Sequence, residues 1–278
     1  MDIPFDDFGS DGPPTHFAHA NGYPPAAYAP LIRKLTPHLH ICAAYSRPLW
    51  LAGGPHDYDL PDWSWMVDDL LGWLEAAGMQ RVIGMGHSMG GVATLLAALR
   101  RPEQFRALVL LDPTLLHTTY AAFFGLLKAL RLIYQFPLLK MTLRRRSVFD
   151  DRAAMFAHYR RKGVFQRVGD EALHILVEAQ ARDRPDGKVT LAYTPAWEAH
   201  VYATSPHYWW GQLDKLQLPV LIIAGRDTDI FGPASIRMFQ RRVPHARIEV
   251  IDDAGHLVPL EQPARVAELI LDFLAGVD

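Results

Sequence analysis

Short apolar runs alternate with longer helical patterns along most of this chain, and this alternation limits the folds it can adopt. The apolar runs are continuous, which is typical of strands buried on both faces. Such strands, separated by helices, form a mostly parallel sheet covered by helices on both sides. The sequence therefore predicts an α/β fold with a doubly wound sheet. The expected strands are 15–20, 38–45, 81–86, 106–113, 218–225 and 246–252, and the expected helices are 24–35, 61–78, 90–100, 233–243 and 263–276.

Residues 114–212 interrupt this alternation. They contain no obvious strand and are rich in helix-forming and aromatic residues, with a turn expected at 183–188. We predict that they form a helical cap inserted between two strands of a core made of residues 1–113 and 213–278. The aromatic residues near the end of the cap, Trp197, Tyr208, Trp209 and Trp210, are expected to serve packing.

Composition excludes several classes of protein. The net charge of −2 gives no basic field for nucleic acid, so no nucleic-acid partner is expected. The single cysteine, Cys42, cannot form an internal disulfide, which suits a reducing compartment such as the cytoplasm. The acidic, proline-rich start predicts no signal peptide. Apolar runs stay short of the roughly 18 residues that span a membrane, so no stable membrane insertion is expected.

The stretch GMGHSMGG, residues 84–91, lies between a predicted strand and a predicted helix. A tight strand-to-helix turn strains its central residue and tolerates only small neighbours, which accounts for Gly86 and Gly90. The hydroxyl of Ser88 would then project above the edge of the sheet, beside the helix N-terminus. A glycine-softened turn without chemistry is the alternative, but the strand before and the helix after favour Ser88 as a nucleophile.

A serine nucleophile needs a base, a carboxylate that orients the base, and donors for the oxyanion. His256 follows the last predicted strand, whereas His245 precedes that strand and should lie at the opposite end of the sheet. Three carboxylates end strands on the same edge as Ser88. They are Asp112, Asp227 and Asp229.

The oxyanion donors are expected from two backbone segments. The N–H of Met89 opens the helix after Ser88, where negative charge is favoured. A second N–H is expected from the loop HANGYPP, residues 19–25, through Asn21 or Gly22, although a simple asparagine–glycine turn explains that loop equally well.

Four segments in order resemble the α/β-hydrolase family: HANGYPP, GHSMGG, GRDTDIFGP and AGHLVPLEQP, with the resemblance spanning 15–113 and 214–276. The resemblance implies an α/β-hydrolase fold and a catalytic triad of Ser88, His256 and Asp229. Asp229 has the family's Asp-x-x-x-Pro spacing to Pro233, and Asp227 is the alternative acid. The acid loop is one residue longer than the commonest form, which leaves Thr228 where that form has aspartate.

The oxyanion loop also departs from the family pattern, because alanine replaces its usual glycine. The second oxyanion N–H is therefore expected from one of four residues, Ala20, Asn21, Gly22 or Tyr23.

The resemblance implies a serine hydrolase that cleaves carboxylic esters through an acyl-enzyme, without a cofactor. Carbon–carbon bond hydrolases, lactonases and cofactor-free haloperoxidases of the same fold share this triad, and a slow-turnover ligand receptor is a further alternative. No metal is expected: the histidine pair His38 and His40, with His16 and His19, has no carboxylate or cysteine cluster beside it.

The cap is expected to line the substrate pocket with large uncharged side chains. Such a pocket favours neutral esters with short to medium acyl chains, unless the basic residues expected at its rim turn inward. Those basic residues are Lys128, Arg131, Lys140, Arg144, Arg145 and Arg146. The lining residues expected are His87, Phe123, Phe124, Leu126, Leu127, Leu130, Tyr134 and Trp197. The oligomeric state is left open.

Overall fold

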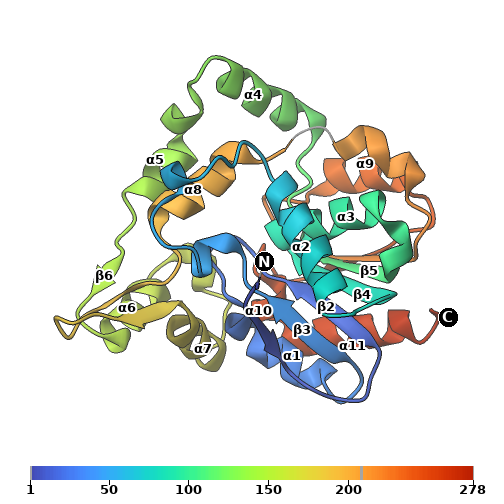
Figure 1. The fold of residues 1–278 in the computed structure, drawn as a ribbon, viewed down its shortest axis with the longest axis horizontal. Coiled ribbons are helices and arrows are strands. Elements are labelled where there is room, and N and C mark those ends of the chain that lie inside the picture. The colour runs from blue at the N-terminus through green and yellow to red at the C-terminus, as the bar shows by residue number, and fades with distance from the viewer. Residues whose placement is uncertain (1, 207–208, 278) are drawn as a thin grey trace.

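The structure, a computed structural model, describes residues 2–206 and 209–277. Seven strands form one sheet in the order β1-β3-β2-β4-β5-β9-β10, which confirms the mostly parallel sheet (Figure 1). Within the described part of this sheet, the edge strand β1 pairs antiparallel with β3, and the other neighbouring strands pair parallel. The strands are β1 (Phe5–Asp7), β2 (Pro14–Ala18), β3 (His40–Ala44), β4 (Val82–His87), β5 (Phe105–Leu111), β9 (Val220–Gly225) and β10 (Arg247–Ile251).

Helices cover both faces of this sheet, as expected for a doubly wound fold. The apolar side chains of α1 and α11 share one buried cluster, and those of α2, α3 and α9 share another on the opposite face. The helices are α1 (Ala29–Leu35), α2 (Ser64–Ala76), α3 (Met89–Arg100), α9 (Pro233–Arg242), α10 (Val258–Glu261) and α11 (Pro263–Leu274). β1 and α10 were not predicted from the sequence, because elements this short carry no readable periodicity.

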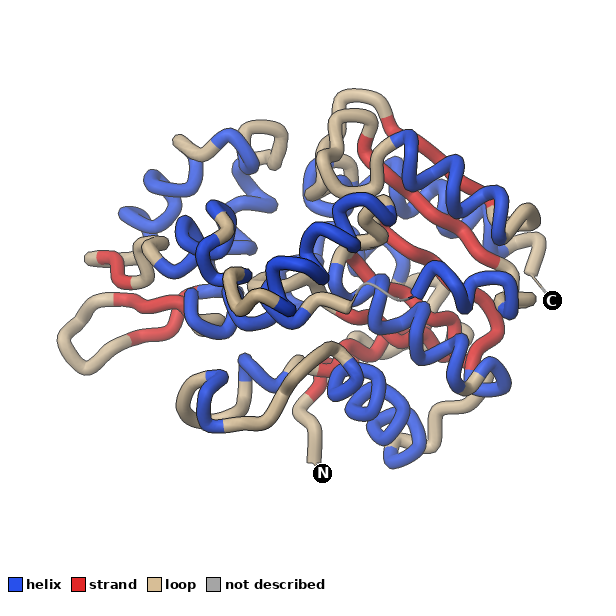
Figure 2. Tube along the Cα trace, turned by 90° about the horizontal axis from the view of Figure 1, so that it is seen from above, coloured by secondary structure: helices blue, strands red, loops and turns tan. Residues whose placement is uncertain are grey.

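In its described residues, the segment predicted as a cap contains five α-helices and a small sheet. Its elements are α4 (Thr118–Ala129), α5 (Pro137–Leu143), β6 (Val148–Phe149), α6 (Arg152–Arg160), α7 (Asp170–Gln180), β7 (Ala181–Asp183), β8 (Val189–Leu191) and α8 (Pro195–Thr204). The expectation of a segment without strands is wrong: β6, β8 and β7 pair as a three-stranded sheet. Figure 2 shows the β7–β8 hairpin projecting from the molecule, and its turn lies where the sequence predicts one.

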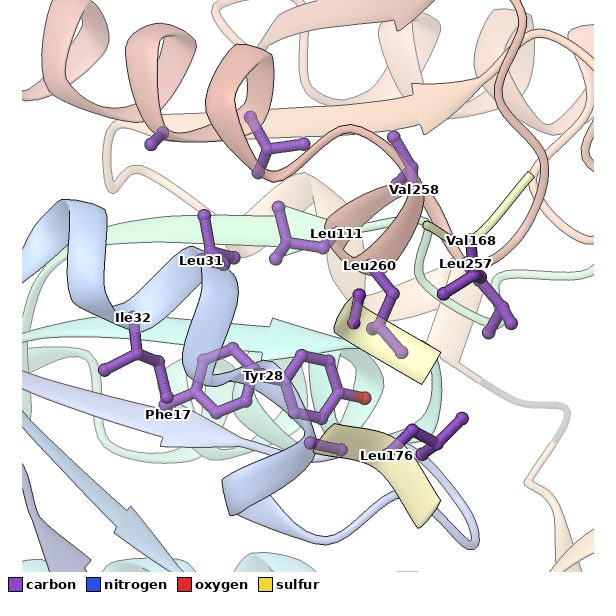
Figure 3. Close-up of a cluster of buried hydrophobic side chains, with 14 of the residues drawn as sticks. Phe17, Tyr28, Leu31, Ile32, Leu111, Val168, Leu176, Leu257, Val258 and Leu260 are labelled. Atoms are coloured by element: carbon purple, nitrogen blue, oxygen red, sulfur yellow. The ribbon is translucent and has the colours of Figure 1, made fainter. Parts of the chain in front are cut away.

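This segment, residues 114–212, is called the cap below. It packs on the core against the residues that follow β10. Leu176 of α7 and Val168 belong to the same buried cluster as Tyr28, Leu257 and Leu260 of the core, as Figure 3 shows. Because Leu257 and Leu260 follow His256 directly in the chain, this contact fixes the cap against the segment that carries the predicted base. Within the described chain, no helix is both long and apolar enough to cross a membrane.

The turn between β4 and α3 leaves no room for a side chain at its glycines. A Cβ at Gly90 would lie 2.2 Å from the carbonyl oxygen of Ala18, and one at Gly86 would lie 2.5 Å from that of Gly90. The backbone of α3 therefore touches the end of β2 directly. This close approach sets where Ser88 stands relative to the loop after β2.

We predict that Gly90→Ala destabilises the fold by about 3 kcal/mol, because the methyl group must displace backbone at the turn. Gly72→Ala is the matched control, since Gly72 lies in helix α2 and a Cβ there meets nothing within 4 Å. That change should be neutral or stabilise by about 0.5–1 kcal/mol. Urea unfolding of both variants checks the prediction, and equal midpoints would contradict the backbone contact.

Candidate active site

Ser88 stands between β4 and α3 in a strained backbone conformation, with φ 54° and ψ −118°. Its N–H donates to the carbonyl oxygen of Leu111 at 2.9 Å, and its own carbonyl accepts from the N–H of Thr114 at 3.3 Å. These bonds, one to the end of β5 and one to the segment that follows it, hold the strained turn in place. The structure thus provides the strand–turn–helix context in which a serine hydroxyl is presented above a sheet.

His256 lies beside Ser88, as expected for its base. The Nε2 of His256 is 2.9 Å from Oγ of Ser88. The rival His245 is exposed and bonds to the carbonyl oxygen of Leu218, which precedes β9 at the opposite end of the strand. His256 can therefore accept the serine proton, and His245 cannot.

His87 was expected in the substrate pocket, but its ring instead contacts the backbone of His256. Its ring is fully buried, with Nε2 2.8 Å from the carbonyl oxygen of His256 and Nδ1 2.8 Å from the hydroxyl of Tyr28. Burial first, and then the nearby His256, lower the pKa of His87 well below its usual value. A neutral ring at this position holds the base without repelling the imidazolium that forms during proton transfer.

The carboxylate beside His256 is Asp112, and the prediction of Asp229 is wrong. Oδ2 of Asp112 is 2.5 Å from Nδ1 of His256. Asp229 is exposed, and Asp227, the alternative, is exposed and paired with Arg167 at 2.6 Å. The reason lies in the strand order: β5, which ends just before Asp112, is the direct neighbour of β4, whereas β9 lies one strand further away.

Thr228 takes part where the common form of the loop has an aspartate. Its hydroxyl donates to Oδ2 of Asp112 at 2.6 Å. The role of Thr228 was missed, although the extra residue in its loop was the signal that could have found it. The orienting carboxylate therefore comes from one loop and a hydroxyl that supports it comes from the next.

Asp112 is fully buried and its backbone has φ 38°, a conformation that aspartate tolerates better than most residues. Burial raises the pKa of Asp112, while the hydrogen bonds from His256 and Thr228 oppose that shift. Its other oxygen, Oδ1, has no partner among the described residues. With Nδ1–H bonded to this carboxylate, Nε2 of His256 faces Ser88 as an acceptor.

The hydrogen bonds that the loop after β2 already makes reduce the number of N–H groups that could bind an oxyanion. The N–H of Ala20 donates to the hydroxyl of Tyr28 at 3.1 Å, and the N–H of Tyr23 donates to the carbonyl oxygen of Ala20 at 3.1 Å. Neither of these two N–H groups is free, so the candidates for the second oxyanion donor are reduced to the N–H groups of Asn21 and Gly22. Asn21 lines the same cavity as Ser88 and Met89, which favours the N–H groups of Asn21 and Met89.

The cap holds this oxyanion loop in position. Nδ2 of Asn21 donates to the carbonyl oxygen of Glu198 at 3.1 Å, and Nε2 of Gln180 donates to that of Gly22 at 2.6 Å. The hydroxyl of Tyr159 donates in turn to Oε1 of Gln180 at 2.6 Å. Sequence patterns gave no signal for the two contacts between the cap and the oxyanion loop, because they join residues more than 150 positions apart.

The cavity that opens at Ser88 has a volume of about 90 Å³ and a mostly apolar wall. Thr114 lines it, with Oγ1 3.0 Å from Oγ of Ser88. An apolar cavity at a nucleophile suits an uncharged hydrocarbon portion of a substrate. Its apolar lining residues include Trp63, Leu116, Phe124, Leu138, Val201, Pro206 and Ile230.

Most of the side chains expected in this pocket lie elsewhere. Phe124 lines the cavity as predicted, but Phe123, Leu126, Leu130 and Tyr134 are exposed and do not line it. Leu127 packs against a small cluster of cap side chains, and Trp197 is buried with its Nε1–H donated to the carbonyl oxygen of Gly53.

Of the remaining aromatic residues near the end of the cap, Trp210 serves packing as expected. It is buried and donates its Nε1–H to the carbonyl oxygen of Leu116 at 2.9 Å. Tyr208 and the side chain of Trp209 lie outside the part that the structure describes.

Among the described residues, Asp7, His40 and Cys42 on β1 and β3 could offer donor atoms to a metal ion, all within 4.8 Å of one another. They already satisfy each other, since Nε2 of His40 is 2.8 Å from Oδ1 of Asp7. Burial raises the pKa of the Cys42 thiol to about 11, which disfavours the thiolate that a metal would need. None of the three lines the cavity at Ser88.

We predict that Asp112→Asn lowers kcat for 4-nitrophenyl butyrate by about a thousandfold or more, because His256 is then left in the wrong tautomer. Asp229→Asn is the matched control and should stay within about twofold of the wild type, since no bond to His256 is lost. Steady-state kinetics of the two variants, with circular dichroism to confirm folding, make the comparison. A larger loss for Asp229→Asn would overturn the assignment.

We also predict that the free energy of unfolding falls as the pH is lowered from about 6.5 to 4.5. Burial lowers the pKa of His16 to about 3 and of His19 to about 4, and it lowers that of His87 further below its usual value. The unfolded chain then binds more protons than the folded one. Each histidine removes up to about 1.4 kcal/mol of stability per pH unit across that window.

Urea unfolding across the window measures this slope. His16→Gln should reduce it by about one proton, while His38→Gln removes an exposed histidine and serves as the surface control. Stability that is flat or rises on acidification would show that these rings are not held neutral.

Comparison with known proteins supports the fold described above. A family model described as the alpha/beta hydrolase fold matches residues 42–263. The chain is 26% identical over 227 residues to the sn-1-specific diacylglycerol lipase ABHD11 of Mus musculus, covering 80% of this chain and 67% of that protein. It is also 26% identical over 214 residues to a 2-hydroxymuconate semialdehyde hydrolase of Pseudomonas putida, covering 76% of this chain and 69% of that protein.

Solved structures show the same fold over almost the whole chain. The structure of E-2-(acetamidomethylene)succinate hydrolase superposes with a TM-score of 0.82 at 22% identity, covering 99% of this chain and 95% of that one. An enol-lactonase from Burkholderia xenovorans superposes with a TM-score of 0.68 at 16% identity, covering 99% and 96%. The family match and the strand order together show that this chain belongs to the alpha/beta hydrolase fold family.

Proposed function

We propose that this protein is a serine hydrolase that cleaves carboxylic esters with short to medium acyl chains. The observation that carries the proposal is a continuous line of hydrogen bonds from Asp112 through His256 to Ser88, ending at an apolar cavity. This arrangement is that of a nucleophile, its base and the group that orients the base. The names of relatives include lipases, which act on esters.

The reaction follows from the positions of these groups. Oγ of Ser88 attacks the ester carbonyl carbon while its proton passes to Nε2 of His256, and the carbonyl oxygen becomes an oxyanion held by the N–H groups of Met89 and Asn21. The carbon–alkoxy bond then breaks, and His256 returns the proton to the departing alcohol. Water, activated by His256, attacks the acyl-enzyme and releases the acid and free Ser88.

The cavity limits the acyl chain. At about 90 Å³ it holds only a few carbon atoms beside Ser88, and its wall is mostly apolar. Each methylene that enters contributes roughly 0.8 kcal/mol, so affinity rises until the chain outgrows the cavity. Phe124 and Leu138 of the cap form part of this limit.

We predict that kcat/KM for 4-nitrophenyl esters rises from acetate through the first few methylenes and then falls well before palmitate. Phe124→Ala should move the maximum to longer chains, because it enlarges the cavity. Phe123→Ala is the matched control, since the Phe123 side chain is 47% exposed and does not line the cavity. Ser88→Ala should lose about a thousandfold in kcat with every ester.

Three outcomes would contradict this proposal and point elsewhere. A maximum at palmitate, sharpened by lipid emulsions, would indicate a lipase. Negligible turnover of all esters, with turnover of vinylogous diketones or lactones, would indicate a carbon–carbon bond hydrolase or a lactonase. A single turnover that leaves Ser88 acylated would indicate a ligand receptor.

A further inference from the structure

A second, larger cavity adjoins the one at Ser88. It has a volume of about 660 Å³ and is walled mainly by the cap. Leu138 and Tyr202 line both cavities, so the two cavities adjoin at these side chains. A substrate held at Ser88 can therefore extend into the second cavity past Leu138, a flexible side chain that is 41% exposed.

The second cavity is strongly basic. Arg144, Arg145, Arg146 and Lys162 line it, against Glu198 as the carboxylate among its described lining residues. Arg145 turns inward and pairs with Glu198 at 2.6 Å, with both side chains largely buried. Three cationic side chains remain after this pair is set aside.

Two of these cations are unused by the fold. The side chains of Arg144 and Lys162, both exposed residues, have no hydrogen-bond or ion-pair partner among the described residues. Arg146 donates to the carbonyl oxygen of Val148, lies 3.9 Å from a carboxylate oxygen of Asp150 and stacks over Phe149 at 4.6 Å. The sequence adds to the positive field, because no acidic residue occurs between Asp112 and Asp150. Charges without structural partners, gathered around one cavity, point to a ligand of opposite charge.

His158, in the same wall, reports this field. Burial first, and then the neighbouring cations Lys162, Arg146, Arg161 and Arg145, lower its pKa. Three of these cations, Lys162, Arg146 and Arg145, line the cavity together with His158, so positive charge gathers around this ring.

The wall of the basic cavity is fixed relative to Ser88. Tyr159, which lines it, receives a hydrogen bond from Arg145 at 2.9 Å and donates to Gln180. Gln180 in turn holds Gly22 of the oxyanion loop. A group bound by this wall would therefore stand at a set distance from the oxyanion donors, as a substrate subsite requires.

We propose that the basic cavity binds an anionic group, a carboxylate or a phosphate, carried by the substrate at the end remote from the scissile ester. This inference rests on the proposed function, since it assigns the substrate class of the same Ser88 site. It replaces the neutral ester expected from the apolar lining, because Arg144 and Lys162 line the adjoining cavity without partners among the described residues.

Matched esters test the proposal. The mono-4-nitrophenyl esters of glutaric and adipic acid carry a terminal carboxylate. The matched neutral compounds are the mixed diesters, in which this carboxylate is a methyl ester and the 4-nitrophenyl ester is kept. In the wild type, kcat/KM should favour the carboxylate member by about tenfold, and added salt should weaken the preference. The double variant R144Q/K162Q should abolish the preference while leaving turnover of the neutral esters unchanged.

Two variants control for global effects of charge and fold. Arg131→Gln removes an exposed cap cation that does not line the cavity and should keep the preference. Arg144→Lys with Lys162 intact should keep most of it, because the charge remains. A wild type that turns over both esters of each pair equally would overturn the proposal.

Binding measured without turnover separates this inference from the proposed function. Calorimetric titration of the wild type with glutarate and with inorganic phosphate should give saturable binding that R144Q/K162Q loses, and the tighter anion identifies the group. If no ester is hydrolysed but this binding is seen, the ester proposal fails and the anion site stands. Absence of binding by both anions, or binding that is unchanged in the double variant, would overturn the anion site.

Discussion

The hydrogen bond between Asp112 and His256 is the interaction on which the rest of the site depends. It fixes the tautomer of the base and aims Nε2 at Ser88, and it exists only because β5 lies directly beside β4 in the sheet. Asp112 is removed from water and supported by Thr228, so the fold keeps its carboxylate for this contact. The backbone strain at Ser88 and Asp112, both with positive φ, shows that the surrounding sheet holds the two residues in place.

The sheet positions the catalytic side chains, and the cap forms the cavities around them. It walls the cavity at Ser88, holds the oxyanion loop through Gln180 and the backbone of Glu198, and contributes every cation around the adjoining cavity. An apolar space at the nucleophile and a basic space behind it divide recognition between hydrocarbon and charge. The family offers a common triad, and on this account the cap decides which substrate reaches it.

The sheet, Ser88 and His256 could be predicted because each leaves a local pattern: continuous apolar strands, glycines around a strained serine, and a histidine after the last strand. The carboxylate that orients His256 could not be predicted, because Asp112, Asp227 and Asp229 all follow strands at the same edge of the sheet. The order of the strands selects among them, and strand order is a non-local property. The prediction of the side chains that line the pocket failed for a similar reason. Hydrophobicity showed that α4 is apolar, but the face that turns toward Ser88 depends on packing within the cap, so Phe124 was found and Phe123 was misplaced.

The most direct test of the account is the rate at which a fluorophosphonate modifies the protein, with the modified residue located by peptide mass spectrometry. The account predicts one adduct, on Ser88, formed rapidly in the wild type and in Asp229→Asn and far more slowly in Asp112→Asn. An adduct on another serine, or an unchanged rate in Asp112→Asn, would contradict the claim that Asp112 and His256 activate Ser88.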